Sequence, residues 1–314
     1  MSVPATAHTA RVPPANPLGI HALVWVDHWD IASAELAIEQ TARAGYALIE
    51  LPMLDPGAVD AKRLRERITA AGLAARCSLG LTFDADISSE DPEIARRGEQ
   101  RLVAALEAAS TVGADMLAGV LYSALAKYSK PASQRGRRNA VDALGRLADR
   151  AASLGMTLGL EVVNRYESNV VNTAKDTLRL LDDIGRPNVT VHLDSYHMNI
   201  EEVDLHQPII ACGKRLGYVH VGANHRGYLG SGHLELAVLF RALVEVGYSG
   251  PITFEAFSAP AEPTGLFDTL AIWRRLWDDR GDLARAARLY MESQLVAARQ
   301  AGLASGLPAA PTAG

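Results

Sequence analysis

A unit made of an amphipathic helix, a glycine and a short apolar run recurs seven times along the chain. Glycine after a helix readily adopts the left-handed conformation that ends the helix and turns the chain back. The glycines at these junctions are Gly45, Gly72, Gly113, Gly155, Gly185, Gly217 and Gly247. With the opening run "LGIHALVW" (18–25) counted as the first strand, the pattern predicts eight strands that alternate with helices, which is typical of a parallel sheet.

Eight parallel strands in one chain favour closure into a barrel. We therefore expect an α/β fold, a single-domain (β/α)8 TIM barrel over residues 19–300, with an extra C-terminal helix. A doubly wound open sheet is the alternative, but no G-x-G-x-x-G follows the first strand to support it. Residues 1–18 and 301–314 are rich in small residues, so we expect a disordered N-terminal extension and a flexible C-terminal tail.

Charge and composition exclude several classes of protein. The formal net charge of −5 over 314 residues gives no basic surface that would hold nucleic acid. No apolar run approaches the roughly 20 residues of a membrane span, and the first residues lack the apolar stretch of a signal peptide. Cys77 and Cys212 stand far apart in apolar surroundings, which is typical of reduced thiols. We expect a cytoplasmic protein that binds neither nucleic acid nor membrane.

Residue parity within four predicted strands brings ligand-type side chains to one face. In a barrel strand, alternate side chains point to the surrounding helices and to the barrel axis. Apolar residues occupy one face of "LGLEVV", "VTVHLD", "YVHV" and "ITFEAF", which leaves on the other face Glu161, Asp194, His220 and Glu255. All four lie near the C-terminal ends of their strands, where barrel enzymes build their active sites. His192 shares this face, and we expect a structural role for it.

Three carboxylates buried together need a cation, because unpaired buried charges are costly. Ion pairs are one solution, but Arg76 in the third strand is the only inward-facing basic residue that the pattern offers. A divalent metal is the better account, with the ligands Glu161, Asp194, His220 and Glu255. Three oxygens and one nitrogen favour Mn2+, with Mg2+ and Co2+ behind it.

Four segments extend this interpretation to a family. "GLEVVNRYESNVVNTA", "HLDSYHMNIEE", "YVHVGANHRGYLGSGH" and "ITFEAFS" resemble the matching segments of the ketose 3-epimerases, which act on D-tagatose, D-allulose (D-psicose) and L-ribulose. These enzymes belong to the sugar phosphate isomerase/epimerase superfamily, whose fold is the xylose isomerase-like TIM barrel. The resemblance spans residues 19–299 and implies metal-dependent epimerisation of free ketoses at C3, with the same four metal ligands.

Glu161 and Glu255 are also the expected catalytic bases. They come from strands three places apart in a ring of eight, so they can face a planar intermediate from opposite sides. One would take the proton from C3 and the other would return a proton to the opposite face of an enediolate that the metal stabilises.

The resemblance also implies which residues contact the sugar. Glu167, His197 and Arg226 correspond to substrate-binding residues of the family, and His21 and Trp29 to part of the sugar-facing wall. The sequence departs from the family at Ala223, where relatives usually carry an acid. The residues expected to form the pocket walls and to set sugar preference are His21, Trp29, Tyr122, Ala223 and Tyr228.

Two alternative functions stay open at this point. One is an aldose–ketose or hydroxypyruvate-type isomerase on the same barrel, and the other is a sugar-binding barrel without catalysis. Retention of both Glu161 and Glu255 argues against the second, because binding alone needs no base on each face. The expected partners are a small-molecule sugar and one divalent metal per chain, with no nucleotide cofactor, and the family resemblance suggests a homodimer or homotetramer.

Overall fold

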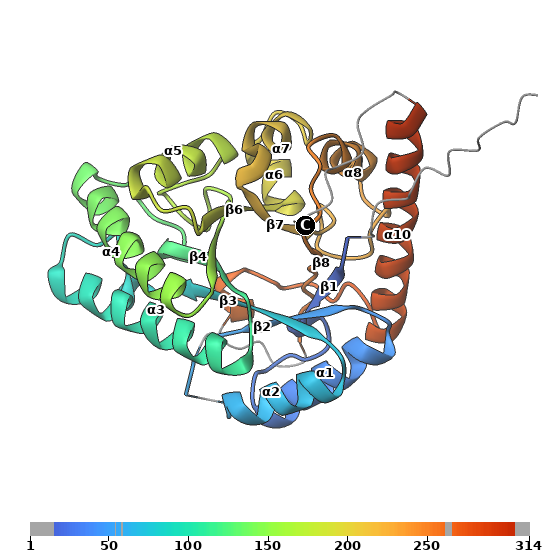
Figure 1. Cartoon of the computed structure of the whole chain (residues 1–314), viewed down its shortest axis with the longest axis horizontal. Helices are drawn as coiled ribbons and strands as arrows, with labels where there is room; N and C mark the ends of the chain where they lie inside the picture. The colour runs from blue at the N-terminus through green and yellow to red at the C-terminus, as the bar shows by residue number, and fades with distance from the viewer. Residues whose placement is uncertain (1–15, 54, 58, 261–265, 305–314) are drawn as a thin grey trace, which may run out of the picture.

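The eight predicted strands are present and close into one parallel barrel (Figure 1). The computed structural model describes residues 16–53, 55–57, 59–260 and 266–304. The strands are β1 (Leu18–His21), β2 (Leu48–Pro52), β3 (Ala74–Leu81), β4 (Met116–Ala124), β5 (Thr157–Glu161), β6 (Val189–Asp194), β7 (Leu216–Val221) and β8 (Ile252–Phe254). They follow one another in chain order, and β1 closes the ring against β8. The predicted barrel is confirmed and the open sheet is excluded.

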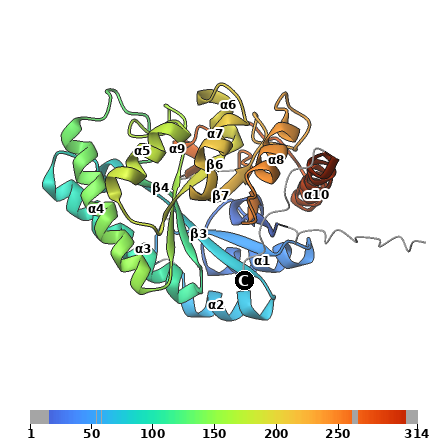
Figure 2. The ribbon, with the colours of Figure 1, turned by 45° about the horizontal axis from the view of Figure 1, so that its top comes forward.

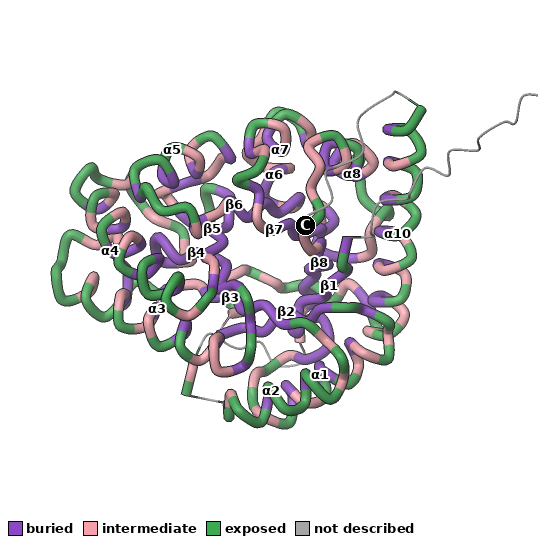
Figure 3. The backbone as a smooth tube through the Cα atoms, in the orientation of Figure 1, coloured by how far each residue is buried: buried purple, intermediate pink, exposed green. Residues whose placement is uncertain are grey.

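Helices connect the strands and cover the outside of the barrel (Figure 2). The α-helices are α1 (Ile31–Arg43), α2 (Ala61–Ala70), α3 (Pro92–Val112), α4 (Gln134–Ser153), α5 (Ala174–Ile184), α6 (Ser195–Glu201), α7 (Gln207–Cys212), α8 (Leu236–Glu245), α9 (Leu266–Thr269) and α10 (Arg280–Ala304). Short 3-10 helices are η1 (Ala22–Val24), η2 (Phe83–Ala85) and η3 (Gly213–Arg215). The strands are buried and the outward faces of the helices are exposed (Figure 3), so the core lies within the barrel and under its helices.

The expected C-terminal helix is α10, which packs beside α8 (Figure 1). The Tyr46 hydroxyl donates a hydrogen bond to the Ala284 carbonyl (2.8 Å) and ties α10 to the segment before β2. The described elements start at Leu18, one residue before the expected bounds 19–300, and end at Ala304, four residues after them. The helix α10 extends past residue 300 because its buried stripe continues through Gly302. Most of the expected extension (1–15) and of the expected tail (305–314) lies outside the described residues.

In the part of the chain that the structure describes, no helix has the length and apolar character needed to cross a membrane. Cys77 and Cys212 are both buried free cysteines, as the sequence suggests.

Six of the seven predicted junction glycines have the positive φ of a helix end, but the prediction is wrong at Gly217. Gly217 lies inside β7, and the preceding helix α7 has already ended at Cys212. A Cβ atom at Gly217 would lie only 2.1 Å from Thr190 Oγ1 of β6. This glycine therefore allows β6 and β7 to approach each other, and does not turn the chain.

Candidate active site

Four side chains converge at the C-terminal ends of neighbouring strands. Glu161 ends β5, Asp194 ends β6, His220 lies next to the end of β7, and Glu255 directly follows β8. The register of β6 and β7 sets Asp194 beside His220. One ligand atom from each of the four lies within 4.8 Å of the others. The faces that parity predicts thus bring the four together, and their role as metal ligands stays a prediction.

Two atoms of this cluster favour a cation. His220 Nδ1 and Asp194 Oδ2 are buried and have no hydrogen-bond partner among the described residues. His220 Nδ1 lies 3.5 Å from Glu255 Oε1 and 3.9 Å from Glu161 Oε1. Buried polar atoms are normally paired, so unpaired nitrogen and oxygen lone pairs that face the same carboxylates fit a divalent metal.

The carboxyl groups of the cluster repel one another. Burial raises the pKa of Glu161 well above its usual range, and the neighbouring Glu255 and Asp194 add to this effect against the opposing His220. Burial likewise raises the pKa of Glu255 to about 7, although His220 and Arg226 oppose the shift. The cluster therefore needs either protons or a cation to offset its charge.

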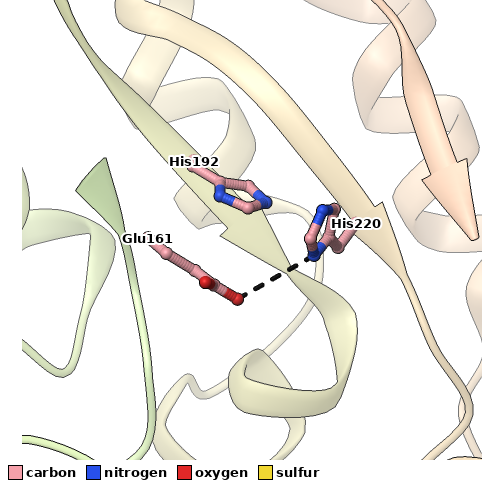
Figure 4. Close-up of side chains that lie close together, drawn as sticks. All are labelled: Glu161, His192 and His220. Atoms are coloured by element: carbon pink, nitrogen blue, oxygen red, sulfur yellow. Dashed lines mark ion pairs between the residues drawn. The ribbon is translucent and has the colours of Figure 1, made fainter. Parts of the chain in front are cut away.

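His192 offers a second set of ligands with Glu161 and His220 (Figure 4). Its ring lies edge-to-face against that of His220, with centroids 4.1 Å apart, and both of its ring nitrogens are buried without a partner among the described residues. This set shares two members with the four-residue cluster, so one metal cannot use both fully. The four-residue cluster offers four ligands and includes the carboxylates of Asp194 and Glu255, whereas this set offers three, so we favour the four-residue cluster.

A cavity opens above the cluster. Six residues of the predicted site line it, namely His21, Glu161, Glu167, His197, Arg226 and Glu255. Asp194 and His220 are almost fully buried beneath it. Apolar side chains complete the wall, among them Leu125, Phe257, Leu266 and Leu270.

Arg226 is the cation that pairs with the cluster, and Arg76 is not. Arg226 Nη1 donates to Glu255 Oε2 (2.7 Å), and Nη2 lies 3.8 Å from Glu167 Oε1. The guanidinium also stacks over the Tyr196 ring at 3.7 Å, and a φ of 64° gives Arg226 a left-handed backbone that non-glycine residues rarely adopt. Arg76 instead donates to Asp115 and to a main-chain carbonyl of β7. Among the three cluster carboxylates, Arg226 donates a hydrogen bond to Glu255 and lies 3.9 Å from Asp194 Oδ2, and it reaches both from a loop.

His197 is held in one tautomer. Its Nδ1 accepts from the Asn164 main-chain N–H (3.2 Å) and lies 2.9 Å from Asn164 Nδ2, so we assign the proton to Nε2. Nε2 lies 3.7 Å from Glu161 Oε1 and 3.8 Å from Glu167 Oε2, at the base of the cavity. Burial, with a contribution from Arg226, lowers the pKa of His197 well below its usual range. A neutral imidazole therefore presents an N–H donor to the cavity.

Sequence reasoning missed Asn164 and Glu50. Asn164 Nδ2 donates to Glu167 Oε1 (2.9 Å), so this side chain holds both Glu167 and His197. Glu50 is fully buried in β2, and its Oε2 accepts from His220 Nε2 (2.6 Å). Burial alone would raise the pKa of Glu50, but His220 and His21 outweigh it and lower the pKa. The parity of "LIELP", with Ile49 and Leu51 on one face, carried the signal for Glu50.

Of the five expected wall residues, His21 alone is among the cavity-lining residues. Trp29 is half-buried and packs against the core, and its contact with a sugar stays a prediction. Tyr122 is fully buried and donates to the Glu161 carbonyl (2.6 Å), so it supports the end of β5. Ala223 is buried, and the Tyr228 hydroxyl donates to Asp282 (2.9 Å). The role of these five residues as pocket walls stays a prediction.

Comparison with known proteins places this fold in a family. The chain matches the model of the xylose isomerase-like TIM barrel over residues 38–276. The ketose 3-epimerase of Arthrobacter globiformis is 43% identical over 280 residues, 89% of this chain and 97% of the relative. The L-ribulose 3-epimerase of Methylomonas sp. (strain DH-1) is 46% identical over 276 residues, 88% of this chain and 96% of the relative.

A solved structure extends the similarity to three dimensions. The crystal structure of an N-terminally His-tagged D-allulose 3-epimerase from Methylomonas sp. in complex with D-allulose is 45% identical and has a TM-score of 0.87. The match covers 90% of this chain and 98% of that chain. The chain belongs to the ketose 3-epimerases, a group of isomerase-class enzymes within the xylose isomerase-like TIM barrel family.

Proposed function

We propose that this protein epimerises free ketoses at C3 and depends on a divalent metal, with Mn2+ as the first candidate. The observation that carries the proposal is a pair of buried carboxyl groups, Glu161 and Glu255, that line one cavity above the unpaired His220 Nδ1 and Asp194 Oδ2. Relatives that act on ketoses, L-ribulose and D-allulose support this choice of substrate class.

The metal would be held by Glu161, Asp194, His220 and Glu255. When bound, it supplies Lewis-acid stabilisation of the negative charge that develops on the substrate oxygens. The predominance of oxygen ligands supports a hard cation such as Mn2+.

Glu161 and Glu255 move the proton in this proposal. Carboxylates commonly act as general bases, and both of these carboxyl groups line the cavity. Their strands, β5 and β8, lie three places apart in the barrel. One carboxylate takes the C3 proton, and the other returns a proton to the opposite face, which inverts the configuration.

Three further side chains bind and orient the sugar. The Nε2–H of His197 donates to the substrate carbonyl oxygen, and the Glu167 carboxylate accepts from a hydroxyl group. Arg226 donates to the sugar from the loop above. Its guanidinium also pairs with Glu255 (2.7 Å) and so holds this base in place. Each role uses a group that already faces the cavity.

The test compares products with and without metal. Metal-stripped protein is incubated with D-fructose, D-tagatose, D-allulose and L-ribulose, with or without Mn2+, and the products are separated by chromatography. The C3 epimer, formed only with Mn2+, is expected. An aldose product would support an isomerase on the same barrel, and binding without any product would support a non-catalytic barrel. Either result would overturn the proposal.

A further inference from the structure

We propose that Glu50 is a positioning residue of the metal centre, which holds His220 with Nδ1 directed at the metal and links this ligand to His21 in the sugar-facing wall. Glu50 lies in the middle of β2 and is fully buried. It belongs to neither group of metal-ligand candidates. The inference rests on the proposed function, but its test measures metal affinity, which does not depend on epimerase activity.

The contacts of Glu50 place it behind the ligand. His220 Nε2 lies 2.6 Å from Glu50 Oε2, on the edge of the ring opposite to Nδ1. Nδ1 is the atom that lies near Glu161 and Glu255. Glu50 therefore lies where an outer carboxylate would, which accepts the other ring N–H of a metal-binding histidine and does not itself bind the metal.

This contact decides which tautomer His220 adopts. A carboxylate oxygen at 2.6 Å accepts the Nε2–H, so Nδ1 is the ring nitrogen that is left to bind a metal. Without Glu50, a buried Nε2–H would lack its acceptor. The proton would then be drawn to Nδ1, near the acceptor carboxylates of Glu161 and Glu255, and a protonated Nδ1 cannot bind the metal.

A chain of hydroxyl groups fixes Glu50 in turn. The Tyr218 hydroxyl donates to Glu50 Oε2 (2.6 Å) and lies 2.6 Å from Thr253 Oγ1. Because Tyr218 gives its only hydroxyl proton to Glu50, the Thr253 hydroxyl donates to Tyr218. Oε2 thus accepts two hydrogen bonds, from Tyr218 and from His220.

The other carboxylate oxygen of Glu50 faces the sugar cavity wall. His21 Nδ1 accepts from the Leu23 main-chain N–H (3.3 Å), so the His21 proton lies on Nε2. His21 Nε2 lies 3.8 Å from Glu50 Oε1 and 3.4 Å from Ser78 Oγ. One buried carboxylate thus contacts both a metal ligand and a residue that lines the cavity.

The experiment measures metal affinity in the full-length protein. Mn2+ and Co2+ are titrated by calorimetry into the metal-stripped wild type, Glu50→Gln, Glu50→Ala and Tyr218→Phe. Loss of an outer carboxylate typically weakens metal binding by roughly 10- to 100-fold. We expect a loss in this range for Glu50→Ala, smaller losses for Glu50→Gln and Tyr218→Phe, and an altered Co2+ absorption spectrum in both Glu50 variants.

The matched control is Glu202→Gln, which makes the same chemical change at a partly buried carboxylate. Glu202 accepts from the Ala174 main-chain N–H at the start of α5 (2.7 Å), away from the cluster, so wild-type affinity is expected. If Glu50→Ala does not fold, the isosteric Glu50→Gln still decides the matter. Wild-type affinity and spectrum in Glu50→Gln and Tyr218→Phe would overturn the inference, as would a wild type that binds neither ion. Metal binding without epimerisation would overturn the proposed function alone.

Discussion

Side chains that face the cavity are held by a second polar side chain. Asn164 holds His197 and Glu167, and Arg226 pairs with Glu255. Such fixed partners keep a reacting group in its working orientation without reorganisation during the reaction. We therefore expect the polar pairs at the barrel mouth to matter as much as the groups that we propose to contact the sugar.

Asn164→Ala tests this at the residue scale. The change removes the amide that lies against His197 Nδ1 and donates to Glu167, while the main-chain N–H of residue 164 stays in place. Loss of a buried hydrogen bond costs about 1–3 kcal/mol, and about 1.4 kcal/mol corresponds to tenfold. We expect kcat/KM for the ketose to fall by roughly tenfold or more.

Asn169→Ala is the control in the same loop, since Asn169 Nδ2 donates to the Lys130 carbonyl at the surface. Equal kinetics in the two variants would contradict the assigned role.

Protons and metal compete for the cluster. The carboxylates of Glu50, Glu255 and Glu161 outweigh burial and raise the pKa of His220 to about 10, and the pKa of Glu255 is raised to about 7. Groups with pKa values at or above the working pH hold protons that a metal must displace. We therefore expect Mn2+ affinity to rise as the pH is raised from about 6 to about 8, with proton release on binding. Calorimetry in buffers of different ionisation enthalpy measures this release, and a constant affinity would count against the ligand assignment.

At the scale of the element, the pairing of β6 with β7 sets the geometry of the cluster. Asp194 and His220 are register partners, and the approach of their strands depends on Gly217 against Thr190. The glycine that the sequence pattern placed at a turn thus serves strand packing. A glycine in front of an apolar run can either end a helix or allow two strands to approach, and the sequence around Gly217 does not distinguish the two.

Gly217→Ala is expected to destabilise the barrel. The added methyl group would lie 2.1 Å from Thr190 Oγ1, so the strands must shift, and overpacking typically costs about 1–3 kcal/mol. The control is Gly145→Ala in α4, where an added Cβ meets nothing within 4 Å. That change should stabilise the helix by up to about 1 kcal/mol. Urea unfolding of both variants measures the difference, and equal stabilities would show that β6 and β7 have room for a side chain.

Strand parity predicted the convergence of Glu161, Asp194, His220 and Glu255 because it is a local property of each strand. It could not predict that Glu50 would contact His220, since these residues are 170 positions apart and meet only through barrel closure. The position of Arg226 likewise depends on a left-handed backbone in a loop, for which the sequence offers no periodic signal. Register across the barrel and loop conformation are the parts that sequence patterns leave open.

At the scale of the whole molecule, we expect metal binding and folding to be linked. The barrel gathers three carboxylates near His220, and a cation that binds them only in the folded state stabilises that state. At about 100 times its Kd, such a ligand adds about 2.7 kcal/mol. We expect Mn2+ to raise the Tm of the metal-stripped protein by several degrees.

Asp194→Asn provides the control for this shift. An asparagine oxygen can still accept the Tyr196 main-chain N–H that now bonds to Asp194 Oδ1, so the start of α6 is preserved. The variant should fold but lose most of the Mn2+-dependent rise in Tm. An equal rise in wild type and variant would place the metal elsewhere on the molecule.

The position of deuterium after turnover in D2O tests the proposed epimerisation at C3. Metal-loaded protein is incubated with D-allulose or L-ribulose, and the sugars are analysed by NMR. The proposed proton transfer at C3 requires deuterium at C3 of the epimer, with none after metal removal and no epimer from Glu161→Gln or Glu255→Gln. Deuterium at C1 together with an aldose product would contradict it, because the proton would then have moved between neighbouring carbons.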